Sequence, residues 1–200
     1  MVPPSRAQLT GDPLRSAILT AVVEIVAREG FEGATIRRIA TQAGCSAGAV
    51  QKRFATRSDL LRAGFERVVA TSLDRILEST AGESTLIERQ RAAVLETLPL
   101  DPARRDETLV GMSYILRAAV DDGVADLPRH LDQAVHDGLA GDLAQEQALG
   151  RLPPETDVDA TADALLALAD GIALRMLYTP PAEHPALLQA LDVGLRALLT

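Results

Sequence analysis

The sequence predicts an all-α fold, and three observations support that class. Only three Phe and two Tyr occur among 200 residues and Trp is absent, so the core must consist of aliphatic side chains. A core rich in Leu and Ala favours helices over sheets. Apolar residues recur at helical spacing along most of the chain, and no alternating stretch is long enough to predict a strand.

The first predicted helix follows Asp12 and Pro13. Aspartate is a favoured N-cap, and proline is favoured at the first helical position. Gly30 is expected to end this helix. Its apolar residues repeat with helical spacing at Leu14, Ala17, Ile18, Ala21, Val22, Ile25 and Val26.

Two short helices follow, and together they predict a helix-turn-helix. Thr35 is expected to cap the second helix and Ser46 the third, with Gly44 in the turn between them. The apolar positions expected to face the core are Ile36, Ile39, Ala40, Ala49, Val50 and Phe54. The outer face of the third helix is then formed by Ala47, Gly48, Gln51 and Lys52.

The rest of the chain predicts further helices separated by turn residues. They are expected at residues 58–79, 85–98, 104–122, 127–149, 158–178 and 185–199. This layout divides the chain into an N-terminal three-helix domain, residues 1–57, and a C-terminal helical domain, residues 58–200. At this length the chain can hold one large domain or two small ones.

The two closing helices are apolar on more than one face, which indicates burial on most sides. Two interpretations are open: a central core helix, or one face on the body and the other on a second subunit. We favour the second, in which the chain is a homodimer. The residues expected at the interface are Leu168, Leu174, Leu191 and Leu195.

Charge is distributed unevenly along the chain. Residues 1–62 carry nine basic and five acidic side chains, whereas residues 63–200 carry eleven basic and twenty-three acidic ones. The net charge of −8 therefore combines a head of +4 with a body of −12. Such asymmetry predicts that the head binds a polyanion while the acidic body stays in solution.

Several classes of function find no support in the sequence. A single cysteine, Cys45, excludes an internal disulfide and is expected to be a packing residue, while three scattered histidines predict no metal site. Without a Gly-rich phosphate loop or a nucleophile motif, we expect neither an enzyme nor a cofactor. The start has no apolar run after Arg6 and no stretch is long enough to span a membrane, so we expect a cytoplasmic protein.

The helix-turn-helix resembles the DNA-binding domain of TetR-family transcriptional regulators. The resemblance covers roughly residues 14–61 and lies in Thr35-Ile36-Arg37-Arg38-Ile39-Ala40, Ala43-Gly44-Cys45-Ser46-Ala47-Gly48-Ala49-Val50, Phe54, Arg57, Leu60 and Leu61. It departs from the family at Gln51, where Tyr is usual, and at Arg53, where His or Tyr is usual. We expect these departures to alter the preferred operator.

The outer face of the third helix is suited to a DNA major groove. Ala47 and Gly48 have a minimal side chain or none, so the backbone in the first turn of this helix can approach the bases. Gln51 can pair with adenine, and Lys52 can reach guanine or a phosphate. Further arginines are candidates for phosphate contacts. The full set expected to contact DNA is Thr35, Arg37, Arg38, Ser46, Ala47, Gly48, Gln51, Lys52, Arg53 and Arg57.

The resemblance also implies a small-molecule pocket in the C-terminal domain. Residues expected to line it are Met112, Tyr114, Arg117, Asp170, Arg175, Met176 and Tyr178. With so few aromatics, a cage for quaternary ammonium is disfavoured. The sequence therefore predicts a homodimeric regulator of a palindromic double-stranded DNA operator, a repressor released by a small molecule. The alternatives are a helical interaction or sensor protein that has lost DNA binding and, more weakly, a small all-α enzyme.

Overall fold

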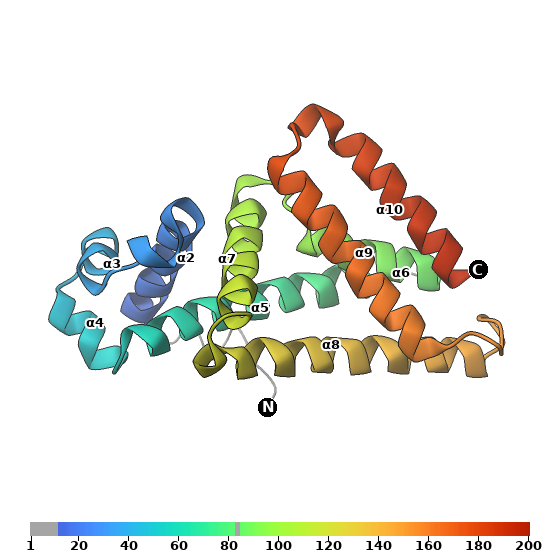
Figure 1. Cartoon of the computed structure of the whole chain (residues 1–200), viewed down its shortest axis with the longest axis horizontal. Helices are drawn as coiled ribbons and strands as arrows, with labels where there is room; N and C mark the ends of the chain where they lie inside the picture. The colour runs from blue at the N-terminus through green and yellow to red at the C-terminus, as the bar shows by residue number, and fades with distance from the viewer. Residues whose placement is uncertain (1–11, 83–84) are drawn as a thin grey trace. The chain divides into compact units, whose positions relative to one another are not determined.

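The computed structural model describes residues 12–82 and 85–200, and over these residues the chain is helical, with no strand. The all-α prediction is confirmed. What was expected of residues 1–11, including the absence of a leader, lies outside the described residues. The helices, coloured along the chain in Figure 1, are α2 (Pro13–Gly33), α3 (Ile36–Gln42), α4 (Ala47–Arg53), α5 (Arg57–Thr80), α6 (Leu86–Thr97), α7 (Pro102–Ala118), α8 (Asp122–Ala148), α9 (Val158–Tyr178) and α10 (His184–Leu199).

The caps of the first three helices form as predicted. Asp12 caps α2 by accepting the backbone N–H groups of Leu14 and Arg15, and Pro13 occupies the first position. Gly30 interrupts the helix with a left-handed φ of 68°, and a further turn continues to Gly33. A glycine is needed there because other residues rarely adopt this φ.

The described chain forms two structural units. The first contains residues 12–75 and 101–116, and the second contains residues 76–100 and 117–200. Helices α5 and α7 each contribute to both units. The functional boundary expected at residues 57 and 58 is a separate division, and it stays a prediction.

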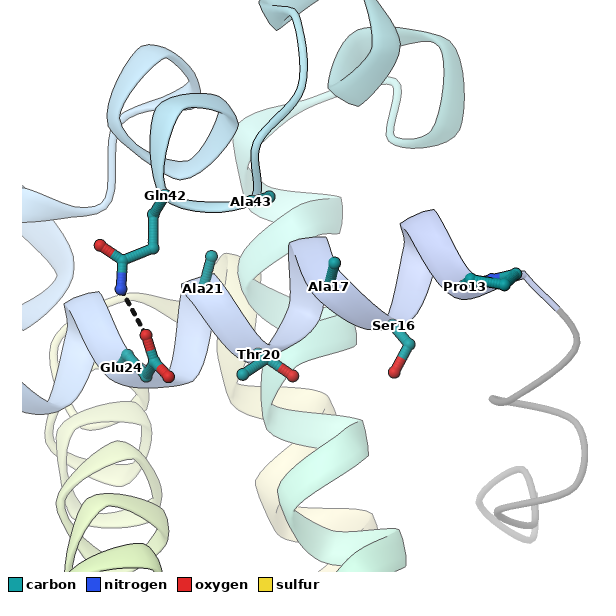
Figure 2. A pocket seen from close by; sticks show the side chains of 8 residues that line it. All are labelled: Pro13, Ser16, Ala17, Thr20, Ala21, Glu24, Gln42 and Ala43. Atoms are coloured by element: carbon teal, nitrogen blue, oxygen red, sulfur yellow. Dashed lines mark hydrogen bonds between the residues drawn. The ribbon is translucent and has the colours of Figure 1, made fainter.

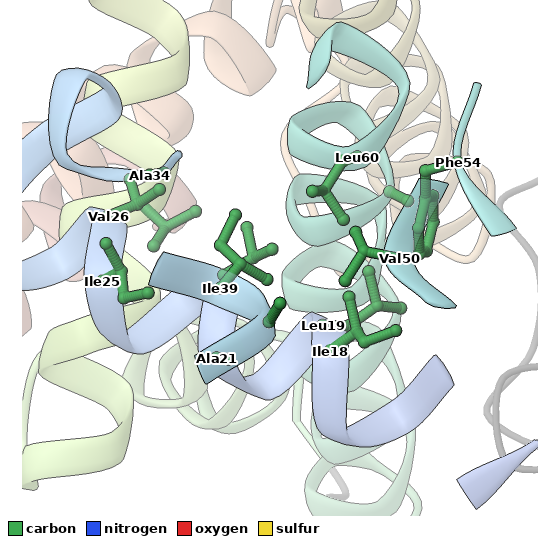
Figure 3. Close-up of a cluster of buried hydrophobic side chains, with 14 of the residues drawn as sticks. Ile18, Leu19, Ala21, Ile25, Val26, Ala34, Ile39, Val50, Phe54 and Leu60 are labelled. Carbon is green, nitrogen blue, oxygen red and sulfur yellow. The ribbon is translucent and has the colours of Figure 1, made fainter. Parts of the chain in front are cut away.

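Aliphatic side chains of α2 form the centre of the first unit (Figure 3). Ile18 and Leu19 are fully buried there with Ile39 of α3, Val50 of α4 and Leu60 of α5. Each such side chain contributes about 1.5–3 kcal/mol relative to an exposed position. The core of the first unit is therefore formed by the same regularly spaced apolar residues that predicted its helices.

Helix α7 is attached to the first unit by an aromatic cluster. The Tyr114 ring stacks on Phe65 of α5 with ring centroids 4.3 Å apart and meets Phe31 of α2 edge-on at 5.9 Å. Val110, one turn before Tyr114, joins the core of the head. Arg75 of α5 adds an ion pair with Glu107 of α7, whose atoms are 2.6 Å apart. These contacts explain why residues 101–116 belong to the first unit.

Two helix boundaries differ from those predicted. Helix α7 ends at Ala118, and α8 begins at Asp122, because the Asp121 carboxylate accepts the N–H of Gly123 and caps the new helix. Gly123 thus lies in the first turn of α8 and does not end α7. Helix α5 is capped by Thr56, whose hydroxyl accepts the N–H of Asp59, and not by Ser58.

The second unit is built on α9 and α10, which lie side by side as an antiparallel pair (Figure 1). A Cβ on Gly194 of α10 would lie 2.5 Å from Leu168 of α9, so the glycine permits their close approach. Leu191 and Leu195 of α10 are fully buried within the one chain. Among the described residues, no helix is long and apolar enough to cross a membrane.

Glu146 is the buried charged residue of the described chain, with 4% of its surface exposed. Its carboxylate accepts from Arg89 of α6 at 2.7 Å and from Arg151, after α8, at 2.6 and 2.8 Å. The hydrogen bond from Arg151, helped by that from Arg89, lowers the pKa of Glu146 to about 2. This cluster ties α6 to the end of α8.

Candidate DNA-binding surface

The helix-turn-helix has the geometry expected from its sequence. The Thr35 hydroxyl accepts the N–H of Arg38 at 3.3 Å, and the Ser46 hydroxyl accepts that of Ala49 at 3.1 Å. Gly44 has a φ of 67° in the turn between α3 and α4. Cys45, beside it, is half-buried and packs against the core of the first unit.

Helix α4 has one buried and one exposed face. Val50 is fully buried and Phe54, just after the helix, is 6% exposed. The residues predicted to face outward are all exposed, namely Ala47, Gly48, Gln51 and Lys52. The helix therefore presents a thin first turn followed by an amide and an ammonium group, a combination able to contact base edges.

The basic residues of the surface divide into free and paired groups. Arg37 and Lys52 are exposed and have no ion pair among the described residues. Arg38 is also exposed, but its guanidinium forms a two-pronged ion pair with Glu29. The Arg53 Nε atom lies 2.7 Å from the Asp12 carboxylate. Only some of the predicted cations are therefore available to phosphates without breaking an internal pair.

Arg57 makes hydrogen bonds inside the first unit. Its side chain is partly buried, with Nε donating to the carbonyl oxygen of Ala34 at 3.0 Å and Nη2 donating to that of Phe31. These bonds fix the connection between α2 and α3. With Nε and Nη2 donating to these carbonyl oxygens, Arg57 has a structural role in the first unit, and its expected phosphate contact stays a prediction.

A hollow of about 430 Å³ lies open on the surface of the first unit between α2 and α3 (Figure 2). Two of its polar side chains, Glu24 and Gln42, are already paired with each other. Gln42 donates to Glu24 and accepts from Arg28 at 3.4 Å. An open hollow with paired polar groups lacks the enclosed apolar walls of a small-molecule site. Its lining is Pro13, Ser16, Ala17, Thr20, Ala21, Glu24, Gln42 and Ala43.

The residues predicted to line a ligand pocket fall into both units. Met112 and Tyr114 belong to the first unit, where Tyr114 is 4% exposed and occupied by its aromatic contacts. Burial raises the pKa of the Tyr114 hydroxyl. These contacts give Tyr114 a role in packing, and its expected ligand role stays a prediction.

The other predicted ligand residues belong to the second unit and do not share one environment. Arg117 forms an ion pair with Asp121, Met176 is 1% exposed, and Tyr178 is 71% exposed. Arg175 is exposed. Partial burial raises the pKa of the Asp170 carboxyl, and the negative charge of Asp132 raises it further, although this residue keeps an exposed surface. These side chains therefore differ in burial, and their shared role in a ligand site stays a prediction.

The residues predicted at a dimer interface also separate. Leu191 and Leu195 are fully buried against their own chain, and Leu168 packs on Gly194. Leu191 and Leu195 therefore pack inside the unit, Leu168 is half-buried there, and the place of these three at a dimer interface stays a prediction. Leu174 is 51% exposed and remains available to a partner.

The sequence prediction missed the surface that α9 and α10 actually expose. A stripe of small and apolar residues runs along each helix at spacings of three and four, the spacing of one helix face. We call it the exposed stripe: Ala167, Gly171, Leu174 and Tyr178 on α9, and Ala186, Ala190, Val193 and Ala197 on α10. The repeat of Ala and Gly at this spacing could have indicated the exposed face, but the interface prediction was based on the leucines.

Comparisons with known proteins match both parts of the chain. Residues 18–63 match the family described as bacterial regulatory proteins, tetR family, and residues 86–200 match BetI-type transcriptional repressor, C-terminal. The HTH-type transcriptional regulator PksA of Bacillus subtilis (strain 168) is 27% identical over 173 residues, which are 86% of this chain and 83% of that protein.

Solved structures show the same architecture. A transcriptional regulator from Rhodococcus sp. Rha1 is 31% identical with a TM-score of 0.80, over 94% of this chain and 96% of that one. A transcriptional regulator from Saccharomonospora viridis, solved in complex with choline, shares the fold at 22% identity with a TM-score of 0.80, over 90% of this chain and 94% of that one.

The exposed face of α4 and the helical second unit together define a helix-turn-helix regulator. The comparisons specify the class further: the chain belongs to the TetR family of bacterial transcriptional regulators. The predicted function, a DNA-binding and ligand-responsive transcriptional regulator, is confirmed, and the alternative of a protein without DNA binding is not favoured. Members of this family bind DNA, dimerise and bind small-molecule effectors.

Proposed function

We propose that this protein is a cytoplasmic homodimeric repressor that binds a palindromic operator through α4 and leaves it when a small molecule binds the second unit. The observation that carries the proposal is the exposed face of α4, where Gln51 and Lys52 follow a thin first turn. Two such faces related by a two-fold axis contact two inverted half-sites, one helical turn or a multiple apart.

Specificity in this proposal comes from Gln51. Its amide can both donate to and accept from adenine in the major groove, which discriminates between bases by about 1–3 kcal/mol. Lys52, next to it, reaches guanine or a phosphate. Arg37 on α3 is the free cation best suited to a phosphate, so it positions the helix without selecting sequence.

The exposed stripe supports dimerisation. Small residues allow two helices to approach closely, and Leu174, Tyr178 and Val193 provide apolar area at 51%, 71% and 61% exposure. Pairing α9 and α10 with the same helices of a second copy makes a four-helix bundle that covers the stripe. The interface residue retained from the sequence prediction is Leu174, and Val193 is added from the structure.

The effector site is proposed for the second unit on the strength of its match to a BetI-type repressor domain. The relative solved with choline shows the same fold. The usual site for a quaternary ammonium group is a cage of several aromatic rings. Residues 76–100 and 117–200 contain a single aromatic residue, Tyr178, so they do not supply such a cage. Asp170 keeps an exposed surface on α9 and is a candidate contact for a polar effector.

Selection of bound duplexes from a random DNA pool tests this function. We expect enrichment of an inverted repeat by the wild-type protein. Gln51→Ala should remove the preference at one or two positions in each half-site, whereas Gln145→Ala, which removes an exposed amide from α8, should leave the enriched sequence unchanged. A pool that shows no enrichment, or an unchanged base preference in Gln51→Ala, would contradict the proposal.

A further inference from the structure

Asp12 makes two sets of contacts at the start of the first helix. Its Oδ1 atom accepts the backbone N–H groups of Leu14 at 3.0 Å and Arg15 at 3.2 Å. Its Oδ2 atom accepts the Nε–H of Arg53 at 2.7 Å. Arg53 is the last residue of α4, so one carboxylate joins the beginning of α2 to the end of the proposed recognition helix.

Arg53 is held in one orientation by these contacts. Besides the bond from Nε to Asp12, its Nη1 donates to the carbonyl oxygen of Ala49, one turn earlier, at 3.4 Å. Next to this pair, the guanidinium of Arg15 lies 5.5 Å from the centre of the Phe54 ring and also joins α2 to the end of α4. Only Nη2 of Arg53 has no acceptor among the described residues.

The pair stays charged through the ordinary pH range. The hydrogen bond from Arg53, followed by that from the Arg15 backbone, lowers the pKa of Asp12. The same bond raises the pKa of Arg53. The side chains are 28% and 41% exposed for Arg53 and Asp12, so the pair lies at the surface, where it is accessible to a DNA phosphate.

Lys52 provides the contrast, because it is the neighbour of Arg53 and has no ion pair among the described residues. A free cation attracts a phosphate at long range and displaces a counterion from DNA when it binds. A cation with an internal carboxylate presents almost no net charge and displaces none. Two adjacent basic residues therefore differ in what they contribute to DNA binding.

We propose that Asp12 sets the DNA affinity of the head by neutralising Arg53 and holding it at the end of α4 as a support for the helix. Phosphate contacts are then left to Lys52 and Arg37. The inference rests on the proposed function of α4, and it adds a residue outside the helix-turn-helix that determines affinity. Asp12 acts through Arg53 and is a positioning residue in this sense.

The test is the salt dependence of binding to a labelled duplex, both the selected operator and a scrambled sequence. Asp12→Asn keeps the helix cap, since asparagine caps as well as aspartate, but releases Arg53. One extra phosphate contact per head steepens the slope of log K against log salt by about 1.8 per dimer. We expect tighter binding to both duplexes, with a gain about tenfold larger at 50 mM than at 200 mM salt.

Two controls separate this role from simple charge. In an Arg53→Gln background, Asp12→Asn should leave the slope unchanged, because no cation is released. Glu32→Gln changes the net charge of the head equally, but Glu32 has no ion pair among the described residues, so its effect should be smaller. Thermal unfolding of each variant shows whether the head is intact, and Arg53→Gln gives the comparison even if Asp12→Asn is unstable.

The outcomes are distinct. A slope that steepens only when Arg53 is present supports the inference. An equal change with and without Arg53 overturns it in favour of plain repulsion between Asp12 and DNA, and weaker binding by Asp12→Asn overturns it in favour of Arg53 as a DNA contact oriented by Asp12. A wild-type protein that binds neither duplex refutes the proposed function itself, and the inference with it.

Discussion

The helix-turn-helix and the closing pair of helices differ in how their surfaces are divided. In α4, the buried side holds Val50 and the exposed side holds Gln51 and Lys52, so polarity alone separates the two faces. In α9 and α10 apolar residues lie on both the buried and the exposed side, so polarity does not separate the two faces. On α10, Leu191 and Leu195 fill the interior, while Ala190 and Val193 lie outside.

The chain therefore has two exposed surfaces of opposite chemistry. Each includes small residues, Ala47 and Gly48 in α4 and Ala167 and Gly171 in α9. The first also carries polar side chains, and the second carries apolar ones. A polar surface with small residues suits a DNA groove, and an apolar one suits another helix.

The largest effect should come from placing a charge on the buried face of α10. Leu195→Glu places a charge at a fully buried site, which removes about 2–5 kcal/mol of packing and adds the cost of an unpaired charge. We expect the second unit to unfold, seen as a lost helical signal in circular dichroism. A Leu195→Glu protein that remains folded but becomes monomeric would show that Leu195 faces a partner.

The matched variant on the exposed face is Val193→Glu. Val193 is 61% exposed, so the charge stays in water in the single chain and the fold should persist. In the dimer the same charge is buried at the bundle, and we expect the protein to sediment as a monomer at micromolar concentration. A dimer of undiminished stability would place the interface elsewhere.

The next effect concerns the attachment of α7 to the head. Tyr114→Ala removes the ring between Phe65 and Phe31 and should destabilise the protein by about 3–5 kcal/mol in urea unfolding. Leu116→Ala is the control, since a side chain on the same helix that is 70% exposed should change stability by about 0.5 kcal/mol or less. Equal losses in the two variants would contradict the packing described for Tyr114.

A smaller effect, confined to acid, is expected at Glu146. Its pKa in the folded state is about 2, below the ordinary value of 4.5, so its contribution to stability is complete above about pH 4.5 and is lost as the pH falls toward 2. Glu146→Gln should therefore unfold at lower urea than wild type near pH 7, and the two midpoints should approach each other below pH 4.5 and converge only near pH 2. An exposed control, Glu155→Gln, should follow the wild type throughout.

Most of the head could be predicted from the sequence because its signals are local. Asp12, Thr35 and Ser46 each cap a helix by contacts within three residues, and Gly44 adopts the φ that the turn requires. The outward face of α4 followed from its period alone. The pairs between Arg53 and Asp12 and between Arg38 and Glu29 join separate helices, so no local pattern could identify them.

The closing helices could be predicted as helices but not in their orientation. Period predicts which residues share a face, and it does not say which of two apolar faces packs inside. That choice depends on partners in α6, α8 and the other closing helix, which are distant in sequence. The packing of Tyr114 could not be predicted for the same reason, because its neighbours Phe31 and Phe65 lie on other helices.

The mass of the complex with the selected operator, measured by analytical ultracentrifugation, tests the central claim that the exposed stripe brings two copies of α4 to one site. Two chains per palindrome are predicted for the wild type, and Val193→Glu should lose most of its affinity while keeping its helical signal. A single chain bound to the operator, or Val193→Glu binding as tightly as wild type, would contradict the account.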